Sequence, residues 1–200
     1  MVRQQAASLA EKIVNQLERE QVVGLDPHAF PRPQGDRRKV YSDSERHAWA
    51  VYLFDRGMDH LWVGWPLQAE AYYKEALRLD PDHADAWVHL GNRCLEEGRG
   101  VEALSLYERG QAAAERRTIG DPDRYPHSFG GDVDSRPFMR ALHGRELCLW
   151  RLGRTDEARH IFARMLKLNP NDNQVTRFLI ADLDEGLSWE KSAEKDEPHH

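Results

Sequence analysis

The fold of this 200-residue chain is decided by residues 139–178, which read MRALHGRELCLWRLGRTDEARHIFARMLKLNPNDNQVTRF. Apolar residues recur every three or four positions on both sides of Gly153, and Pro170 follows the second run. This spacing predicts two amphipathic helices joined by a tight turn and ended by the proline. A helical hairpin cannot bury both of its apolar stripes alone, so it is expected to stack on copies of itself.

Copies of this hairpin are present elsewhere in the sequence. A glycine, an alanine and an aromatic residue recur in three places with one fixed offset at each step. The offset is 34 residues from the first set to the second and 55 from the second to the third. The unit is therefore about 34 residues long, with about 21 residues inserted before the third copy. The three sets are Gly64, Ala69 and Tyr73; Gly98, Ala103 and Tyr107; and Gly153, Ala158 and Phe162.

A helical hairpin repeated every 34 residues resembles the tetratricopeptide repeat (TPR) family. Trp87, Leu90 and Gly91 open the second copy at the offsets of the TPR pattern. The resemblance covers about residues 50–185 and implies an all-α fold, a short right-handed TPR superhelix of three helical hairpins. The last unit, which opens with Arg-Pro-Phe-Met-Arg-Ala at residues 136–141, is similar to bacterial TPR proteins of unassigned role and implies no activity.

The flanking segments are predicted from their composition. Residues 1–24 are expected to form an amphipathic helix, with Leu9, Ile13 and Leu17 on one face, that either caps the solenoid or docks on a partner helix. Residues 25–42 hold three prolines and a short basic run, which predicts a linker. The TPR domain is predicted over residues 43–185, with repeats at 50–83, 84–117 and 139–172 and the insertion at 118–137. A capping helix is expected at 173–185 and an acidic, disordered tail at 186–200.

Composition excludes several classes of protein. A net charge of −6 argues against general nucleic-acid binding. No run of about eighteen apolar residues is present, so no membrane span is expected. The N-terminus lacks the apolar core of a signal peptide, and Cys94 and Cys148 both fall in helical runs. Two such thiols favour a reducing compartment, and the expected location is the cytoplasm.

The resemblance to TPR proteins also implies where a ligand would bind. In that family the first helix of each hairpin lines a concave groove. Transferring the family's groove positions to this sequence gives an apolar end and a cationic end, which would match a peptide or protein segment with an acidic part. The alternative is that the N-terminal segment or the insertion fills the apolar end. The implied groove residues are Phe54, Val88, Asn92, Arg140, His143, Trp150 and Arg177.

One specialised TPR function is not expected. TPR proteins that grip a C-terminal carboxylate use lysine, asparagine and arginine at five groove positions. The matching residues of this chain are Phe54, Met58, His89, Arg140 and Gly144. Only Arg140 keeps the positive charge, so a clamp for chaperone tails is not predicted.

The predicted function is a cytoplasmic protein-interaction module or scaffold without catalytic residues, cofactor or metal. One alternative is a structural unit that assembles into a homo-oligomer. A further alternative is a small-molecule or metal enzyme built on the insertion, which holds Asp121, Asp123, His127, Asp132 and Asp134. These residues lack the glycine and glutamate offsets of a calcium-binding loop, and no phosphate loop or paired-histidine zinc motif is found.

Overall fold

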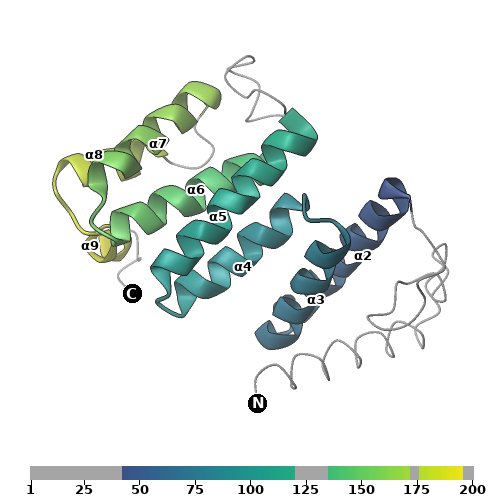
Figure 1. Ribbon diagram of the computed structural model, residues 1–200. Helices are drawn as coiled ribbons and strands as arrows, with labels where there is room; N and C mark the ends of the chain where they lie inside the picture. The colour runs from purple at the N-terminus through teal and green to yellow at the C-terminus, as the bar shows by residue number, and fades with distance from the viewer. Residues whose placement is uncertain (1–41, 120–134, 172–175, 196–200) are drawn as a thin grey trace. The chain divides into compact units, whose positions relative to one another are not determined.

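The computed structural model describes residues 42–119, 135–171 and 176–195, and every regular element within them is helical (Figure 1). The all-α prediction is therefore confirmed. The predicted N-terminal helix, the linker and most of the insertion lie outside the described residues. The helices are α2 (Asp43–Trp62), α3 (Pro66–Leu79), α4 (Ala84–Glu96), α5 (Gly100–Ala114), the π-helical η2 (Glu115–Ile119), α6 (Arg136–Arg151), α7 (Thr155–Leu168), α8 (Thr176–Asp184) and α9 (Trp189–Lys195).

The chain divides into two compact units at residue 86. The described part of the first unit is the hairpin of α2 and α3, together with the connection that leads into α4. The second unit holds the rest of α4 and the helices from α5 to α9. In this second unit α5 packs against α6, α6 against α7, and α7 against α8.

All three hairpins turn in the same way. Gly64, Gly98 and Gly153 have φ angles of 80°, 74° and 74°, a left-handed conformation that glycine adopts without strain. The residue after each glycine donates its backbone N–H to the carbonyl five residues earlier, at 2.8 Å in every case. This bond closes the preceding helix. The three corners are thus equivalent, as the recurrence of the glycine predicts.

Each hairpin of the first two repeats brings a tyrosine of its second helix against a glycine of its first. A Cβ atom added at Gly57 would lie 2.5 Å from the Tyr73 ring, and one added at Gly91 would lie 2.8 Å from the Tyr107 ring. Tyr107 is also pressed against Gly144 of α6, so its ring lies between glycines of two successive hairpins. Both tyrosines are 1% exposed. These contacts allow the helices to approach closely.

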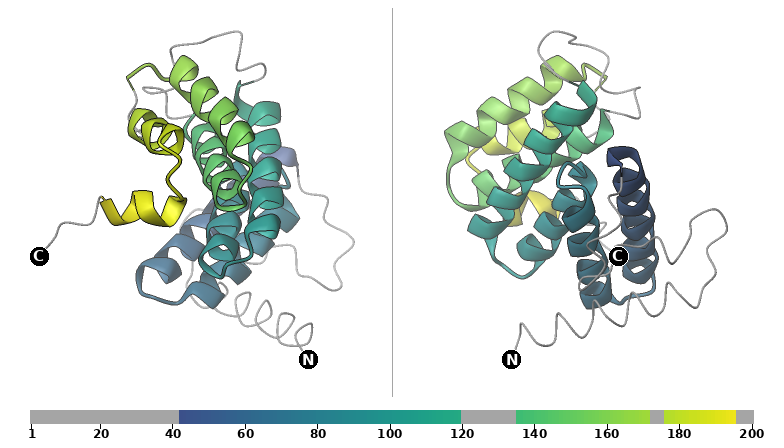
Figure 2. Two further views of the ribbon diagram at one scale, coloured as in Figure 1. Left: turned by 90° about the vertical axis from the view of Figure 1, so that its left-hand side faces the viewer. Right: turned by 45° about the vertical axis from the view of Figure 1, so that its right-hand side comes forward.

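The prediction of a disordered tail over residues 186–200 is wrong for residues 189–195, because they form α9. This helix lies against α8 and near the end of α6 (Figures 1 and 2). Trp189 packs edge-on against Trp150 with 5.8 Å between ring centroids, and the buried Ser192 hydroxyl donates to Asp182 at 2.6 Å. Aromatic packing and a buried hydrogen bond order a segment whose composition is polar.

His83 closes the connection between α3 and α4 and is 8% exposed. Its Nδ1 atom accepts a hydrogen bond from the backbone N–H of Ala86 at 3.3 Å, and its ring packs against Phe54. Burial lowers the pKa of His83 below its usual value of 6.5 and outweighs the opposite effect of Asp85 and Asp80. A proton on Nδ1 would also remove the acceptor that caps α4.

We expect Gly144→Ala to lower the free energy of unfolding by about 1–3 kcal/mol, because the new methyl group would overlap the Tyr107 ring. Gly100→Ala is the matched control, since a Cβ there would meet its nearest neighbour, Leu152, at an ordinary 3.5 Å. That variant should be unchanged or slightly more stable. Urea unfolding followed by circular dichroism measures both, and equal stability of the two variants would contradict the close approach.

His83 should make the protein less stable in mild acid. Because its folded pKa lies below 6.5, the unfolded chain takes up the proton more readily, so the stability contributed above pH 6.5 is lost as the pH falls below that value. We expect wild type to lose more stability than His83→Asn between about pH 7.5 and about pH 5.5. Asparagine keeps an acceptor for the helix cap and does not titrate. Equal losses in urea denaturation would show that His83 is not the group responsible.

Candidate functional site

The second unit contains a pocket of about 470 Å³ between α4, α5 and α6. Helices α4 and α6 are the first helices of the second and third hairpins, and α5 contributes a single residue, Tyr107. Figure 1 shows the three helices next to one another. The residues that line the pocket are Val88, Asn92, Leu95, Glu96, Tyr107, Arg140, His143, Gly144, Leu147 and Arg151.

Tyr107 links the core to the pocket. Its ring is buried against Gly91 and Gly144, and its hydroxyl donates a hydrogen bond to Asn92 Oδ1 at 2.6 Å. Burial raises the pKa of the Tyr107 hydroxyl, which therefore keeps its proton at neutral pH. Because the Asn92 oxygen accepts this bond, the amide nitrogen is the group that the exposed Asn92 side chain offers to a ligand.

A buried carboxylate holds the pocket histidine in place. His143 Nδ1 lies 2.6 Å from Glu146 Oε1, one turn further along α6. The Glu146 side chain is fully buried, whereas the His143 side chain is 33% exposed. A hydrogen bond joins the two groups and fixes the orientation of the imidazole ring. His143 thus meets the pocket as a positioned polar group.

Two arginines give the pocket a cationic side. Arg140 and Arg151 are exposed and lie on α6, and the single acid among the lining residues is Glu96. The Arg151 guanidinium stacks over the ring of Trp189 at 5.1 Å from its centroid, a contact that attracts the cation and orients it. Aliphatic side chains form the remaining wall. The pocket therefore combines apolar surface with positive charge.

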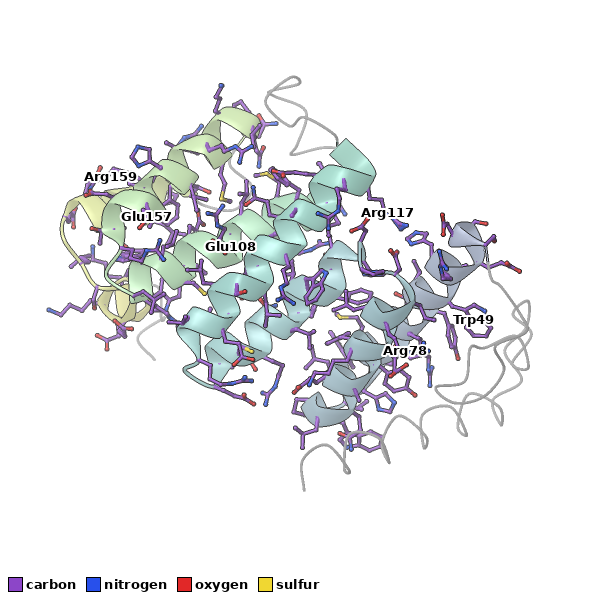
Figure 3. The ribbon with its side chains drawn as sticks, in the orientation of Figure 1. Trp49, Arg78, Glu108, Arg117, Glu157 and Arg159 are labelled. Carbon is purple, nitrogen blue, oxygen red and sulfur yellow. The ribbon has the colours of Figure 1, made fainter. Side chains whose placement is uncertain are left out.

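Charges on the second helices are arranged differently. Glu108 on α5 and Glu157 and Arg159 on α7 are labelled in Figure 3. Glu157 pairs with Arg154 at 2.6 Å, and Arg159 pairs with Asp184 of α8 at the same distance. These exposed pairs satisfy one another and each contributes little stability.

The structure brings four of the seven predicted groove residues together. Val88, Asn92, Arg140 and His143 all line the pocket. Phe54 belongs to the first unit, where it packs against Tyr73 at 5.5 Å between ring centroids.

The other two predicted residues lie elsewhere in the second unit. Trp150 is 4% exposed, and its indole N–H donates to the carbonyl of Leu187 at 3.0 Å. Arg177 is on α8 and donates to the carbonyl of Pro170 at 2.6 Å. Trp150 is absent from the lining because the C-terminal segment covers it.

Leu95 and Leu147 stand at TPR groove positions and Gly144 at a clamp position, so sequence analysis missed three lining residues, Arg151, Glu96 and Tyr107. Arg151 lies four positions after Leu147, on the same face of α6, so helical spacing alone could have identified it. Glu96 carries no comparable signal. The repeat pattern indicates Tyr107 as a packing residue, which it is, and only its three-dimensional contact with Gly144 shows that it also forms the floor of the pocket.

Reactive groups are scarce in the part of the chain that the structure describes. No cluster of three or more histidine, cysteine or acidic residues there has the geometry to hold a metal ion. The acidic residues and the histidine of the insertion lie outside the described ranges. Cys94 and Cys148 are buried and not disulfide-bonded, and burial raises the pKa of Cys148 to about 12, so its thiol stays protonated and unreactive. None of the described helices is long and apolar enough to cross a membrane.

Comparisons with known proteins agree with the repeat structure. A family model described as tetratricopeptide repeat matches residues 54–117. No curated protein matches the sequence. A solved structure described as the first TPR of Spaghetti (RPAP3) bound to the HSP90 peptide SRMEEVD is similar to this chain, with a TM-score of 0.55 and 16% identity over 70% of this chain and 96% of that one. Residues 54–117 therefore match the tetratricopeptide repeat family, and the fold of the chain is that of a TPR domain.

Proposed function

We propose that this protein is an interaction module that binds a segment of a partner protein in the pocket between α4, α5 and α6. One observation carries the proposal: two exposed arginines and a histidine held by a buried glutamate line the same pocket as an apolar wall. Such a combination suits a peptide that presents an acidic side chain beside an apolar one. TPR domains are in general non-enzymatic interaction modules, and this role needs no catalytic residue.

The size of the pocket limits what it can accept. A volume of about 470 Å³ falls within the range of pockets that enclose a small ligand or a few side chains. An arginine binds a carboxylate through two parallel hydrogen bonds, so Arg140 and Arg151 are the proposed contacts for the acidic group. Val88, Leu95 and Leu147 would contact the neighbouring apolar side chain.

The similar TPR domain supports this proposal. Its peptide, SRMEEVD, contains acidic and apolar residues next to each other. The present chain differs from a carboxylate clamp at four of the five clamp positions, so the proposed ligand is an internal or terminal acidic segment in general, not a chaperone tail. We place the interaction in the cytoplasm, since two buried free thiols suit a reducing compartment.

Reversing the charge of Arg140 should weaken binding without unfolding the protein. A displayed library of random twelve-residue peptides would first supply binders, which we expect to be enriched in aspartate and glutamate. The strongest binder, labelled with a fluorophore, is then titrated with wild type and Arg140→Glu. We expect the variant to bind at least tenfold more weakly, a loss of about 1.4 kcal/mol or more.

Lys167→Glu is the matched control for this prediction. Lys167 is exposed on α7 and does not line the pocket, yet its reversal changes the net charge by the same amount. Its affinity should stay close to that of wild type. Binders without acidic enrichment, or equal losses in the two variants, would contradict the pocket as the binding site.

A further inference from the structure

The corner between α2 and α3 differs in chemistry from the two equivalent corners of the chain. In the second hairpin, Arg99 pairs with Glu97 and Glu102 at this corner. In the third, Arg154 pairs with Glu157. In the first hairpin, the same stretch carries four large apolar side chains, here called the tryptophan corner: Trp62, Val63, Trp65 and Leu67, which are 92%, 59%, 53% and 64% exposed.

The turn itself does not require these side chains. Trp65 stands where Arg99 and Arg154 stand in the other hairpins, and all three donate the same backbone hydrogen bond at 2.8 Å. The preceding glycines have nearly equal φ angles. Arginine at the position of Trp65 therefore allows the same turn twice in this chain. The two tryptophans are therefore not required by the geometry of the turn.

The tryptophan corner is an unusual concentration of exposed apolar surface. Among the described residues, eight large hydrophobic side chains are exposed, and four of them fall within these six positions. The ring of Trp65 is backed by His60, which stacks on it at 5.5 Å and on the buried Tyr72 at 5.0 Å. A supported tryptophan with one covered face is a suitable anchor for a binding partner.

We propose that residues 4–22 of the same chain bind the tryptophan corner as an amphipathic helix. The apolar positions of this segment fall on one helical face, and Asn15 falls on the opposite face. Such a stripe needs an apolar surface, and the corner supplies one in the same unit of the chain. The residues on the apolar face are Ala6, Leu9, Ala10, Ile13 and Leu17.

The connection between the two parts has a suitable length. Residues 23–41 lead from this segment to Ser42, the cap of α2. A chain of these 19 residues can reach at most about 65 Å when fully extended. Helix α2 has 20 residues and is therefore about 30 Å long, and the corner lies at its far end. The tether thus keeps the segment near the corner at a high effective concentration, which favours it over a second molecule.

The chemistry of the corner argues against the other occupants. Its four side chains carry no charge, so they offer nothing to an acidic peptide or to the charge of an anionic lipid headgroup. The net charge of −6 also disfavours an anionic membrane surface. This interaction is separate from the proposed peptide site, because the corner belongs to the first unit and the pocket to the second.

Nuclear magnetic resonance of the full-length protein can test this proposal through the tryptophan indole N–H signals, assigned with Trp62→Phe and Trp65→Phe. A nitroxide attached at Asn15→Cys reports proximity, and the buried Cys94 and Cys148 should not compete for the label. We expect the nitroxide to at least halve the Trp62 and Trp65 signals. Ile13→Glu in the labelled protein places a charge on the apolar face and should restore both signals. Glu18→Gln, on the polar face, is the control and should leave the attenuation unchanged.

The outcomes separate the proposed occupant from its alternatives. If residues 4–22 bind the corner of their own molecule, the attenuation will not depend on protein concentration. It will also be absent when the nitroxide is on one set of molecules and the isotope label is on another. Attenuation in the mixed sample would overturn the proposal in favour of a second copy. Unattenuated signals, or binding to vesicles of anionic phospholipid that Trp62→Ala abolishes, would also overturn it. Peptide binding at the pocket is measured separately, so either proposal can fail alone.

Discussion

The close packing of an aromatic ring against a glycine is the contact on which the helical repeat depends. Tyr107 of α5 lies between Gly91 of α4 and Gly144 of α6, so one ring joins the second hairpin to the third. Any side chain at either glycine would occupy the space of that ring. The same ring forms the floor of the pocket and holds Asn92 through its hydroxyl. The site is therefore made from the packing that stacks the repeats.

Periodicity predicted most of the fold, since the glycine, alanine and aromatic markers recur wherever a hairpin turns. The resemblance to TPR proteins, transferred along the repeat, also implied four residues that line the pocket: Val88, Asn92, Arg140 and His143. Periodicity failed where a contact joins segments that are distant in sequence. Local spacing predicts neither the helix at residues 189–195 nor the burial of Trp150. Both depend on the contact between Trp150 and Trp189, which are 39 residues apart in sequence.

The three corners show how little of a repeat is fixed by its backbone. Equivalent turns carry ion pairs in the second and third hairpins and tryptophans in the first. Backbone hydrogen bonds and a left-handed glycine determine the shape, and the exposed side chains are free to vary with function. Comparison among the repeats of one chain thus separates what folding requires from what it does not.

The stacking of Arg151 on Trp189 ties the C-terminal helix to the recognition surface. Arg151 belongs to the lining of the pocket, whereas Trp189 opens α9 and also covers Trp150. Energetic coupling between two sites is reciprocal, so a ligand that prefers this placement of the guanidinium would also hold α9 against the body of the protein. A fusion partner or a proteolytic cut near the end of the chain would then alter recognition without touching any residue of the cavity.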